Sequence, residues 1–289
     1  MDLVSWIFEP FASSFMQRAF ISSLAIGITA PVIGVWAVYK RLVYLTDAMS
    51  HSILAGVAAA AFLGISLAVG GILAALLMAL LVALLIIRVK VPEDSAIGVV
   101  GQGLFALGVI GVGLIGDPRA LSHILFGNPL TVTSTDIVVQ LVLSTVVLFG
   151  LWWLSPLIGI STFDAGHARS VGVRVGLLDT LLIGSLALVV VIGLTSVGVL
   201  MVITLITSPA VAARLMTQRL SRTIPLAAAL GAAAAVVGLV ASYHLAWPSG
   251  PTIALVAIGE VAVVAVVVLI VRQSPLRLIR TRVPESMSP

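Results

Sequence analysis

The chain has 289 residues, of which 61% are hydrophobic and only 9% are charged, with a formal net charge of +4 and a mean hydropathy of +1.26. A soluble domain carries about 25% charged residues, so a water-exposed surface cannot be built from this composition. The sequence therefore excludes a soluble globular protein. It predicts an all-α polytopic protein of the cell membrane, surrounded by membrane lipid.

The first 17 residues contain two acidic residues and no basic one. A signal peptide has a basic start and a small-residue cleavage site, and neither is evident. We therefore expect a mature chain with an external N-terminal segment at 1–17.

Nine later segments are long and apolar enough for spans, since a crossing takes about 20 mostly apolar residues. They lie at roughly 18–39, 42–63, 66–87, 95–116, 133–154, 176–194, 197–213, 223–243 and 251–271. The 42–87 stretch is split near Gly64–Ser66, with Gly70–Gly71 as an alternative, and the 176–213 stretch is split near Thr195–Ser196. These two splits decide between eight and nine spans, and a re-entrant segment would mimic a span.

Basic residues favour nine spans, with the N-terminus outside and the C-terminus in the cytoplasm. Cytoplasmic loops carry an excess of Lys and Arg. In this arrangement every basic residue except Arg18 and Arg119 lies inside, whereas one false split would flip all later loops. The predicted organisation is a transmembrane domain at 18–272, with an external loop at 117–132 and a cytoplasmic loop at 155–175. The cytoplasmic tail, 273–289, is expected to be disordered.

Asp47 and His51 lie four positions apart near the start of the second span. This spacing puts both side chains on one helix face. An aspartate near the bilayer centre costs about 2.5–3.5 kcal/mol on insertion scales. The pair is either structural, or shallow enough to reach water, or a metal site. Two ligands are too few for a tight site, but a second copy would supply two more, and such a set suits Mn²⁺ or Zn²⁺.

The remaining ionisable candidates are weaker. His123 and His244 lie in predicted outer loops, where they either guide a cation or are solvated. Glu260 lies inside the last span, where a partner on a neighbouring helix or a pathway role would explain it. In the inner loop Asp164 is a candidate N-cap for a short surface helix, and His167 is more typical of a contact residue than of a ligand.

Two absences also bear on function. The chain has no cysteine, so disulfides and thiolate metal sites are excluded. It also has no G-x-x-x-x-G-K-[ST] phosphate loop, so any ATPase that drives transport is another polypeptide and this chain is not expected to be an enzyme. An intramembrane metalloenzyme would need a denser ligand set such as H-E-x-x-H, which is not present. The thinly spread basic residues give no indication of nucleic-acid binding.

Six stretches in order resemble the membrane permease subunit of ABC-type importers for manganese, zinc or iron. They are RLVYLTDAMSHSILAGVA (41–58), EDSAIGVV (93–100), LFGNPLTVT (125–133), FDAGHARSVGV (163–173), VGVLMVITLITSPAVAARL (197–215) and WPSGPTIALV (247–256). Each stretch is moderately specific, but six in order over nearly the whole chain form a strong pattern.

The resemblance implies a permease with a second permease copy, two cytoplasmic ATPase subunits and an external metal-binding lipoprotein as partners. It implies that Asp47 and His51 bind the transported Mn or Zn, with no permanently bound cofactor. It also implies that Phe163, Asp164, Ala168, Arg169 and Gly172 belong to a coupling helix that docks on the ATPase. The predicted span puts Asp47 ~10 Å from the inner end of its helix, whereas the resemblance implies a deeper site.

The alternative function is a secondary metal-ion transporter or channel that uses the Asp–His pair as a cation or proton relay. The predicted inner helix argues against it, because a channel needs no docking surface.

Overall fold

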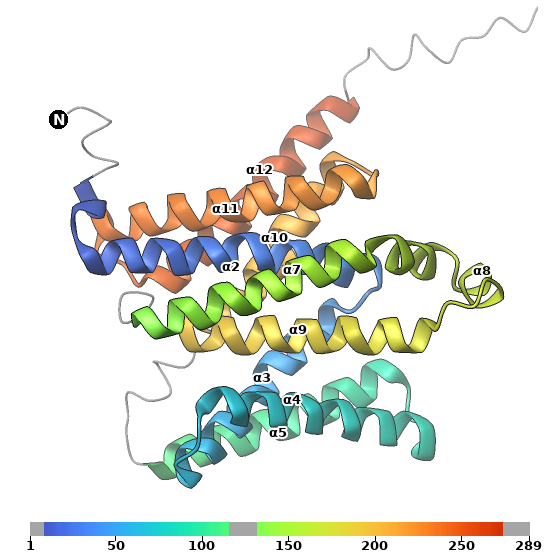
Figure 1. Cartoon of the computed structure of the whole chain (residues 1–289). Coiled ribbons are helices and arrows are strands. Elements are labelled where there is room, and N and C mark those ends of the chain that lie inside the picture. The colour runs from blue at the N-terminus through green and yellow to red at the C-terminus, as the bar shows by residue number, and fades with distance from the viewer. Residues whose placement is uncertain (1–8, 116–131, 274–289) are drawn as a thin grey trace, which may run out of the picture.

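A computed structural model describes residues 9–115 and 132–273, which form a bundle of helices (Figure 1). Nine helices in these two ranges are long and apolar enough to cross a membrane, and the same ranges contain no strand. The spans are α2 (Ser14–Tyr39), α3 (Val43–Leu63), α4 (Leu67–Leu84), α5 (Glu93–Ile115), α7 (Ser134–Phe163), α9 (Val175–Val197), α10 (Val199–Met216), α11 (Leu220–Leu245) and α12 (Ser249–Gln273). A 3-10 turn (Glu9–Ala12) precedes α2, a π-helical turn (Leu85–Val89) follows α4, and α8 (Ala165–Ser170) is short.

Both breaks that set the number of spans are present in the structure. α3 ends at Gly64, whose φ of 67° is a left-handed conformation that glycine adopts without strain. Gly70–Gly71 lies inside α4, so the alternative break is wrong. The second break lies at Gly198, with φ of 89°, rather than at Thr195–Ser196.

The helix before the inner loop is longer than the sequence predicts. α7 continues through Pro156 to Phe163, so the expectation of a loop from 155 is wrong. Proline lacks the N–H that would bond to the carbonyl four residues earlier, here that of Trp152. The hydroxyl of Ser155 donates to that same carbonyl at 2.9 Å. Local hydroxyls of this kind let membrane helices tolerate proline, and the true connection shrinks to 164–174.

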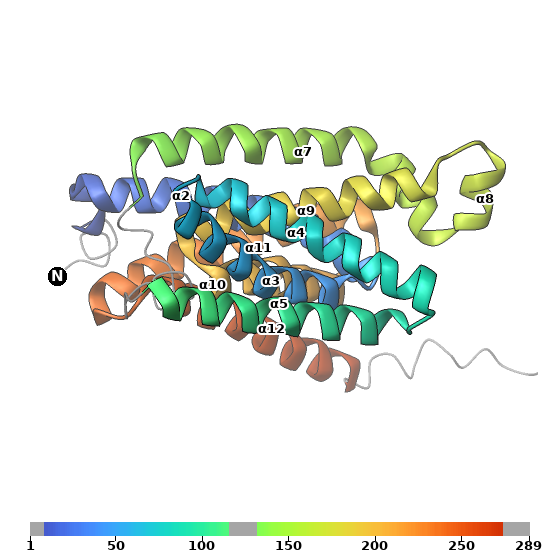
Figure 2. The ribbon, with the colours of Figure 1, turned by 90° about the horizontal axis from the view of Figure 1, so that it is seen from below.

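The helices pack in two groups that α9 connects (Figures 1 and 2). One group contains α3, α4 and α5, and the other contains α2, α10, α11 and α12. α9 contacts α3 and α4 in the first group and α2 and α10 in the second, while α7 packs on α2 and α9. The short helix α8 projects from one end of the bundle, opposite the start of α2 (Figures 1 and 2).

Burial separates a central helix from the peripheral ones. The membrane-length window of α2 is 78% buried, against 17% for α12, so α2 is the core of the second group and α12 exposes most of its apolar surface. Two buried side chains also tie α2 to α7. Ser22 donates to the Gln140 Oε1 atom at 2.8 Å, and the Gln140 amide donates back to the Ser22 carbonyl at 2.8 Å.

Candidate functional site

Asp47 and His51 lie on one face of α3, as their spacing predicts. The His51 Nε2 atom is 3.6 Å from the Asp47 Oδ1 atom. The His51 side chain is 30% exposed and the Asp47 side chain is 45% exposed, so neither is enclosed by its own chain. Two ligand atoms at about 2.1 Å from a tetrahedral cation lie roughly 3.4 Å apart. The observed separation therefore fits two groups that share one cation.

The imidazole of His51 packs against an aromatic ring of α5. The Phe105 ring packs edge-on against it, with centroids 5.1 Å apart. The Nδ1 atom is buried and has no hydrogen-bond partner among the described residues. The ring is thus oriented by packing, and Nε2 remains on the side of Asp47 as the available ligand atom.

The contact with α5 fixes the depth of the pair. Phe105 lies near the middle of Glu93–Ile115, roughly 18 Å along the helix from its start. Gly101 permits the approach, because a Cβ atom there would be 2.9 Å from the Cβ of Ala48. α3 and α5 run side by side from their first turns, with Tyr44 beside Asp94 and Ser95. Asp47 thus lies about one turn from the start of α3, and only His51 lies beside the middle of α5. The pair is therefore no deeper in α3 than the sequence predicts.

The described part of the chain contains no group of three or more His, Asp or Glu side chains that could hold a metal ion. Asp47 and His51 thus form an incomplete ligand set within one copy. Neighbouring hydroxyls do not add to it, because Ser50 and Thr46 donate to the carbonyls of Asp47 and Leu42 in their own helix.

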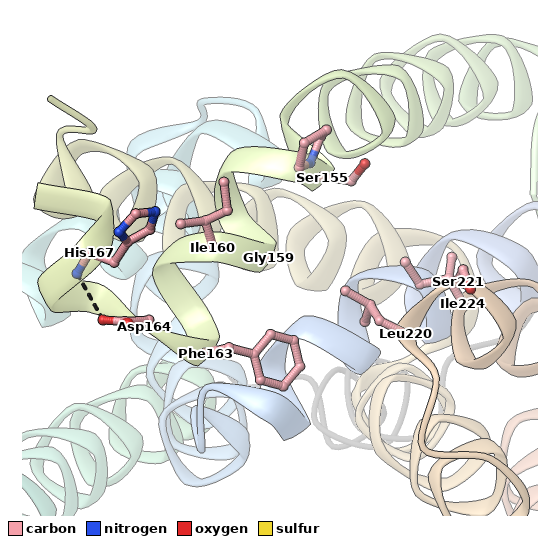
Figure 3. Close-up of a pocket in the computed structure, with 10 residues that line it drawn as sticks. Ser155, Gly159, Ile160, Phe163, Asp164, His167, Leu220, Ser221 and Ile224 are labelled. Atoms are coloured by element: carbon pink, nitrogen blue, oxygen red, sulfur yellow. Dashed lines mark hydrogen bonds between the residues drawn. The ribbon is translucent and has the colours of Figure 1, made fainter. Parts of the chain in front are cut away.

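The short helix α8 forms as predicted, capped by Asp164. The Asp164 carboxylate accepts a hydrogen bond from the His167 backbone N–H at 2.8 Å (Figure 3). Ala168 is fully buried, which anchors the helix, whereas Arg169 is exposed. Gly172 has φ of 83°, a conformation that turns the chain back toward α9.

A groove lies beside α8 at the same end of the bundle (Figure 3). Its wall is formed by the last two turns of α7, including Phe163, by Asp164 and His167, and by Leu220 and Ile224 from the start of α11. Phe163 is 66% exposed, so this end of the protein presents apolar surface as well as charge.

Loss of the cap should loosen α8 without unfolding the bundle. We expect Asp164→Ala to cost about 1 kcal/mol of local stability, since it removes the acceptor for the His167 N–H. Hydrogen exchange measured by mass spectrometry should then accelerate in 164–172 and stay unchanged in α2. Equal exchange in both proteins would contradict the capping role.

The other candidates do not join this site. His123 lies outside the described residues. His244 lies in the last turn of α11 and not in a loop, with its ring edge-on to Tyr243 at 5.2 Å. Glu260 lies within α12, where its Oε2 atom is buried and has no hydrogen-bond partner in the described part of the chain. α12 packs mainly on α10 and α11, so Glu260 is not brought to the Asp47–His51 pair on α3.

Sequence reasoning missed an ion pair between Lys40 and Asp179, 2.7 Å apart and 139 residues apart in the chain. The only local signal is an acidic residue within the first turns of an apolar span.

The nine membrane-length helices in the described ranges, and their arrangement, define this chain as a multi-pass cell-membrane protein of the ABC permease fold. The chain belongs to the ABC 3 transport family, which it matches over residues 12–271. This confirms the resemblance and the fold expected from it.

Several known proteins are similar over most of their length. The manganese transport system membrane protein MntC of Listeria monocytogenes is 35% identical, over 84% of this chain and 87% of that protein. The chelated iron transport system membrane protein YfeD of Yersinia pestis is 32% identical, over 88% of this chain and 86% of that protein. The structure of PsaBC from Streptococcus pneumoniae in complex with Fab superposes with a TM-score of 0.84 at 30% identity, covering 91% of this chain and 95% of that one.

Proposed function

We propose that this chain is the permease subunit of an ATP-driven importer for a divalent transition metal, with manganese or iron favoured by its relatives and zinc by its ligand types. One observation carries the proposal: Asp47 and His51 are partly exposed on a membrane-length helix, with His51 beside the middle of α5. A carboxylate facing lipid near the bilayer centre would cost about 2.5–3.5 kcal/mol. It is therefore expected to face a polar path.

A second copy of the chain would complete both the path and the ligand set. One copy supplies one carboxylate and one imidazole, and its exposed Asp47 side chain leaves room for more ligands. Two copies facing each other would supply two of each, a mixed oxygen and nitrogen set that suits Mn²⁺, Fe²⁺ or Zn²⁺. The metal is the substrate and needs only transient binding, which an incomplete, accessible site allows.

The other proposed partners are two cytoplasmic ATPase subunits and an external metal-binding lipoprotein. The short helix α8 and the adjoining groove support an ATPase contact, because Arg169 on α8 and Phe163 in the groove are both exposed at this end of the bundle. The sequence has no phosphate loop, which supports a separate ATPase.

We propose that the end of the bundle that carries α8 is cytoplasmic. Apart from Arg18, the basic residues in the described ranges belong to this end of the helices: Lys40, Arg41, Arg88, Lys90, Arg169, Arg174, Arg214, Arg219, Arg222 and Arg272. This asymmetry follows the positive-inside rule.

Single-cysteine labelling tests the orientation, because the chain has no native cysteine. In intact cells an impermeant maleimide should label Leu245→Cys, at the exposed end of α11, and should leave His167→Cys unlabelled. After the membrane is opened, both should react. Labelling of position 167 in intact cells would reverse the topology.

Transport itself is tested with the permease, its ATPase and its binding protein in proteoliposomes. We expect manganese uptake that requires ATP on the α8 side, with iron(II) and zinc tested as competitors. Metal uptake without ATP would favour the secondary transporter or channel. ATP-driven uptake of no transition metal would contradict the proposed function.

A further inference from the structure

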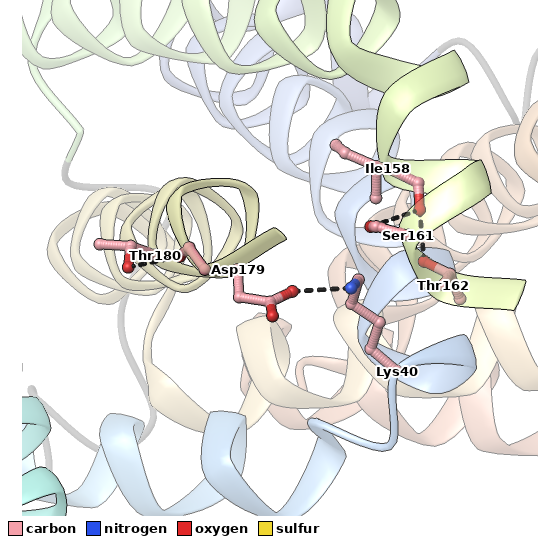
Figure 4. A network of polar contacts seen from close by, with 7 residues as sticks. Lys40, Ile158, Ser161, Thr162, Asp179 and Thr180 are labelled. Atoms are coloured by element: carbon pink, nitrogen blue, oxygen red, sulfur yellow. Dashed lines mark hydrogen bonds and ion pairs between the residues drawn. The ribbon is translucent and has the colours of Figure 1, made fainter. Parts of the chain in front are cut away.

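The connection between α2 and α3 is a tight corner of three residues, Lys40 to Leu42 (Figure 4). Lys40 donates its backbone N–H to the Trp36 carbonyl at 2.9 Å, and Leu42 donates to the Ala37 carbonyl at 2.8 Å. Arg41 has φ of 61°. These bonds fix how α3 leaves α2, so a displacement of the corner must also displace the start of α3, where Asp47 lies.

The Lys40 side chain crosses from this corner to α9. Its Nζ atom is 2.7 Å from the Asp179 Oδ1 atom (Figure 4), and the lysine side chain is only 11% exposed. A buried ammonium group requires such a partner. Asp179 lies in the second turn of α9, the helix that follows α8 in the chain.

The residue before Lys40, Tyr39, contacts the segment that precedes α8 in the chain. Its ring packs edge-on against the Phe163 ring, with centroids 5.6 Å apart. Phe163 ends α7 and directly precedes Asp164, the N-cap of α8. The guanidinium of Arg214, a residue of α10, lies 4.7 Å from the centre of the Tyr39 ring in a cation–π contact.

The two chain segments that flank α8 therefore meet on two consecutive residues, Tyr39 and Lys40. We propose that this corner is the mechanical link between the docking helix and the metal ligands, and that Lys40 is a positioning residue for transport. The proposal rests on the proposed function for the roles of α8 and Asp47. Motion of α8 carries the end of α7 and the start of α9, and these carry the corner and the start of α3.

This link explains why the metal ligands lie on α3 near the corner and not deeper in that helix. Asp47 is within two turns of Leu42, so rotation at the corner reaches it through one short rigid helix segment. The same motion shifts His51 relative to Phe105 on α5, which has no direct contact with α8 among the stronger helix contacts. A change in the α8 environment thus becomes a change in the ligand geometry.

The first test measures metal uptake per ATP hydrolysed in proteoliposomes. For Lys40→Met we expect binding-protein-stimulated ATP hydrolysis to persist while uptake per ATP falls about tenfold, within the usual range of coupling between sites. The reversed pair, Lys40→Asp with Asp179→Lys, should restore most of the ratio. The matched control is Arg41→Met, an exposed charge in the same corner, which should retain the wild-type ratio.

A purely structural ion pair would behave differently, since uptake and hydrolysis would fall together with the amount of folded protein. An unchanged uptake per ATP in Lys40→Met, or an equal loss in Arg41→Met, would overturn the proposal.

A second readout judges the link even if the chain carries a different substrate. Spin labels at Val171→Cys, just after α8, and at Tyr44→Cys, in the first turn of α3, report the distance between the two elements; both sites are exposed. We expect one narrow distance distribution in the purified complex and a broader one after Lys40→Met, but not after Arg41→Met. Identical distributions in all three proteins would refute the link. Absence of ATP-driven metal uptake by the wild type would instead refute the proposed function.

Discussion

Asp47→Asn should reduce metal uptake by about a hundredfold or more while the complex stays folded. The substitution keeps the shape and hydrogen bonding of the side chain but removes the charge that offsets a divalent cation, and even losses of groups behind metal ligands cost 10–100-fold. The Asp47–His51 contact is 3.6 Å and partly exposed, so its loss should change stability little. His51→Ala should give the same result. Uptake of radioactive manganese and the thermal midpoint of the purified complex check both expectations.

A structural pair would show the opposite combination. Breaking it would leave one buried polar partner unsatisfied, at about 1–3 kcal/mol, and would lower the thermal midpoint while transport by the folded fraction persisted. Ser52→Ala is the matched control on α3, because the Ser52 hydroxyl is fully buried and donates only to the Met49 carbonyl. It should transport normally. Wild-type uptake by Asp47→Asn would return the pair to a structural role.

Arg169→Glu should abolish uptake by separating the permease from its ATPase. Arg169 is exposed near the end of α8, where charge-assisted hydrogen bonds to acidic or carbonyl groups of a partner are available. Reversal of the charge turns such contacts into repulsion, whereas the cost to α8 itself is about 0.3–1 kcal/mol through the helix dipole. Co-purification of the ATPase and binding-protein-stimulated ATP hydrolysis measure the effect.

The control for this substitution is Arg174→Glu, which makes the same charge change at an exposed position outside α8. We expect it to keep the ATPase bound. If Arg169→Glu assembles and hydrolyses ATP as the wild type does, the docking surface has been assigned to the wrong residue.

The number of spans could be predicted from the sequence because apolar length and the positions of basic residues both constrain it. The exact end of α7 could not, because a proline usually marks a helix end and only the structure reveals that Ser155 satisfies the carbonyl freed by Pro156. The break at Gly198 was misplaced by a few residues for a related reason. Polar residues at 195–196 resemble a turn, but the conformation of the turn selects the glycine.

The local contacts of the site could be predicted from the sequence, whereas its long-range contacts could not. The proximity of Asp47 and His51 and the capping of α8 by Asp164 follow from helix geometry and were predicted. The contact of the His51 ring with Phe105 depends on where α5 packs, and the Lys40–Asp179 ion pair joins segments 139 residues apart. A single sequence carries no signal for either, because both are set by tertiary packing.

The most direct test of the metal path is anomalous X-ray diffraction from crystals of the complete transporter with Mn²⁺, collected at the manganese edge. We predict an anomalous peak between the two permease copies, within about 2.0–2.3 Å of the Asp47 carboxylate and the His51 Nε2 atom, and its loss in Asp47→Asn. A peak elsewhere along the path, with the Asp47–His51 pair metal-free, would contradict the account.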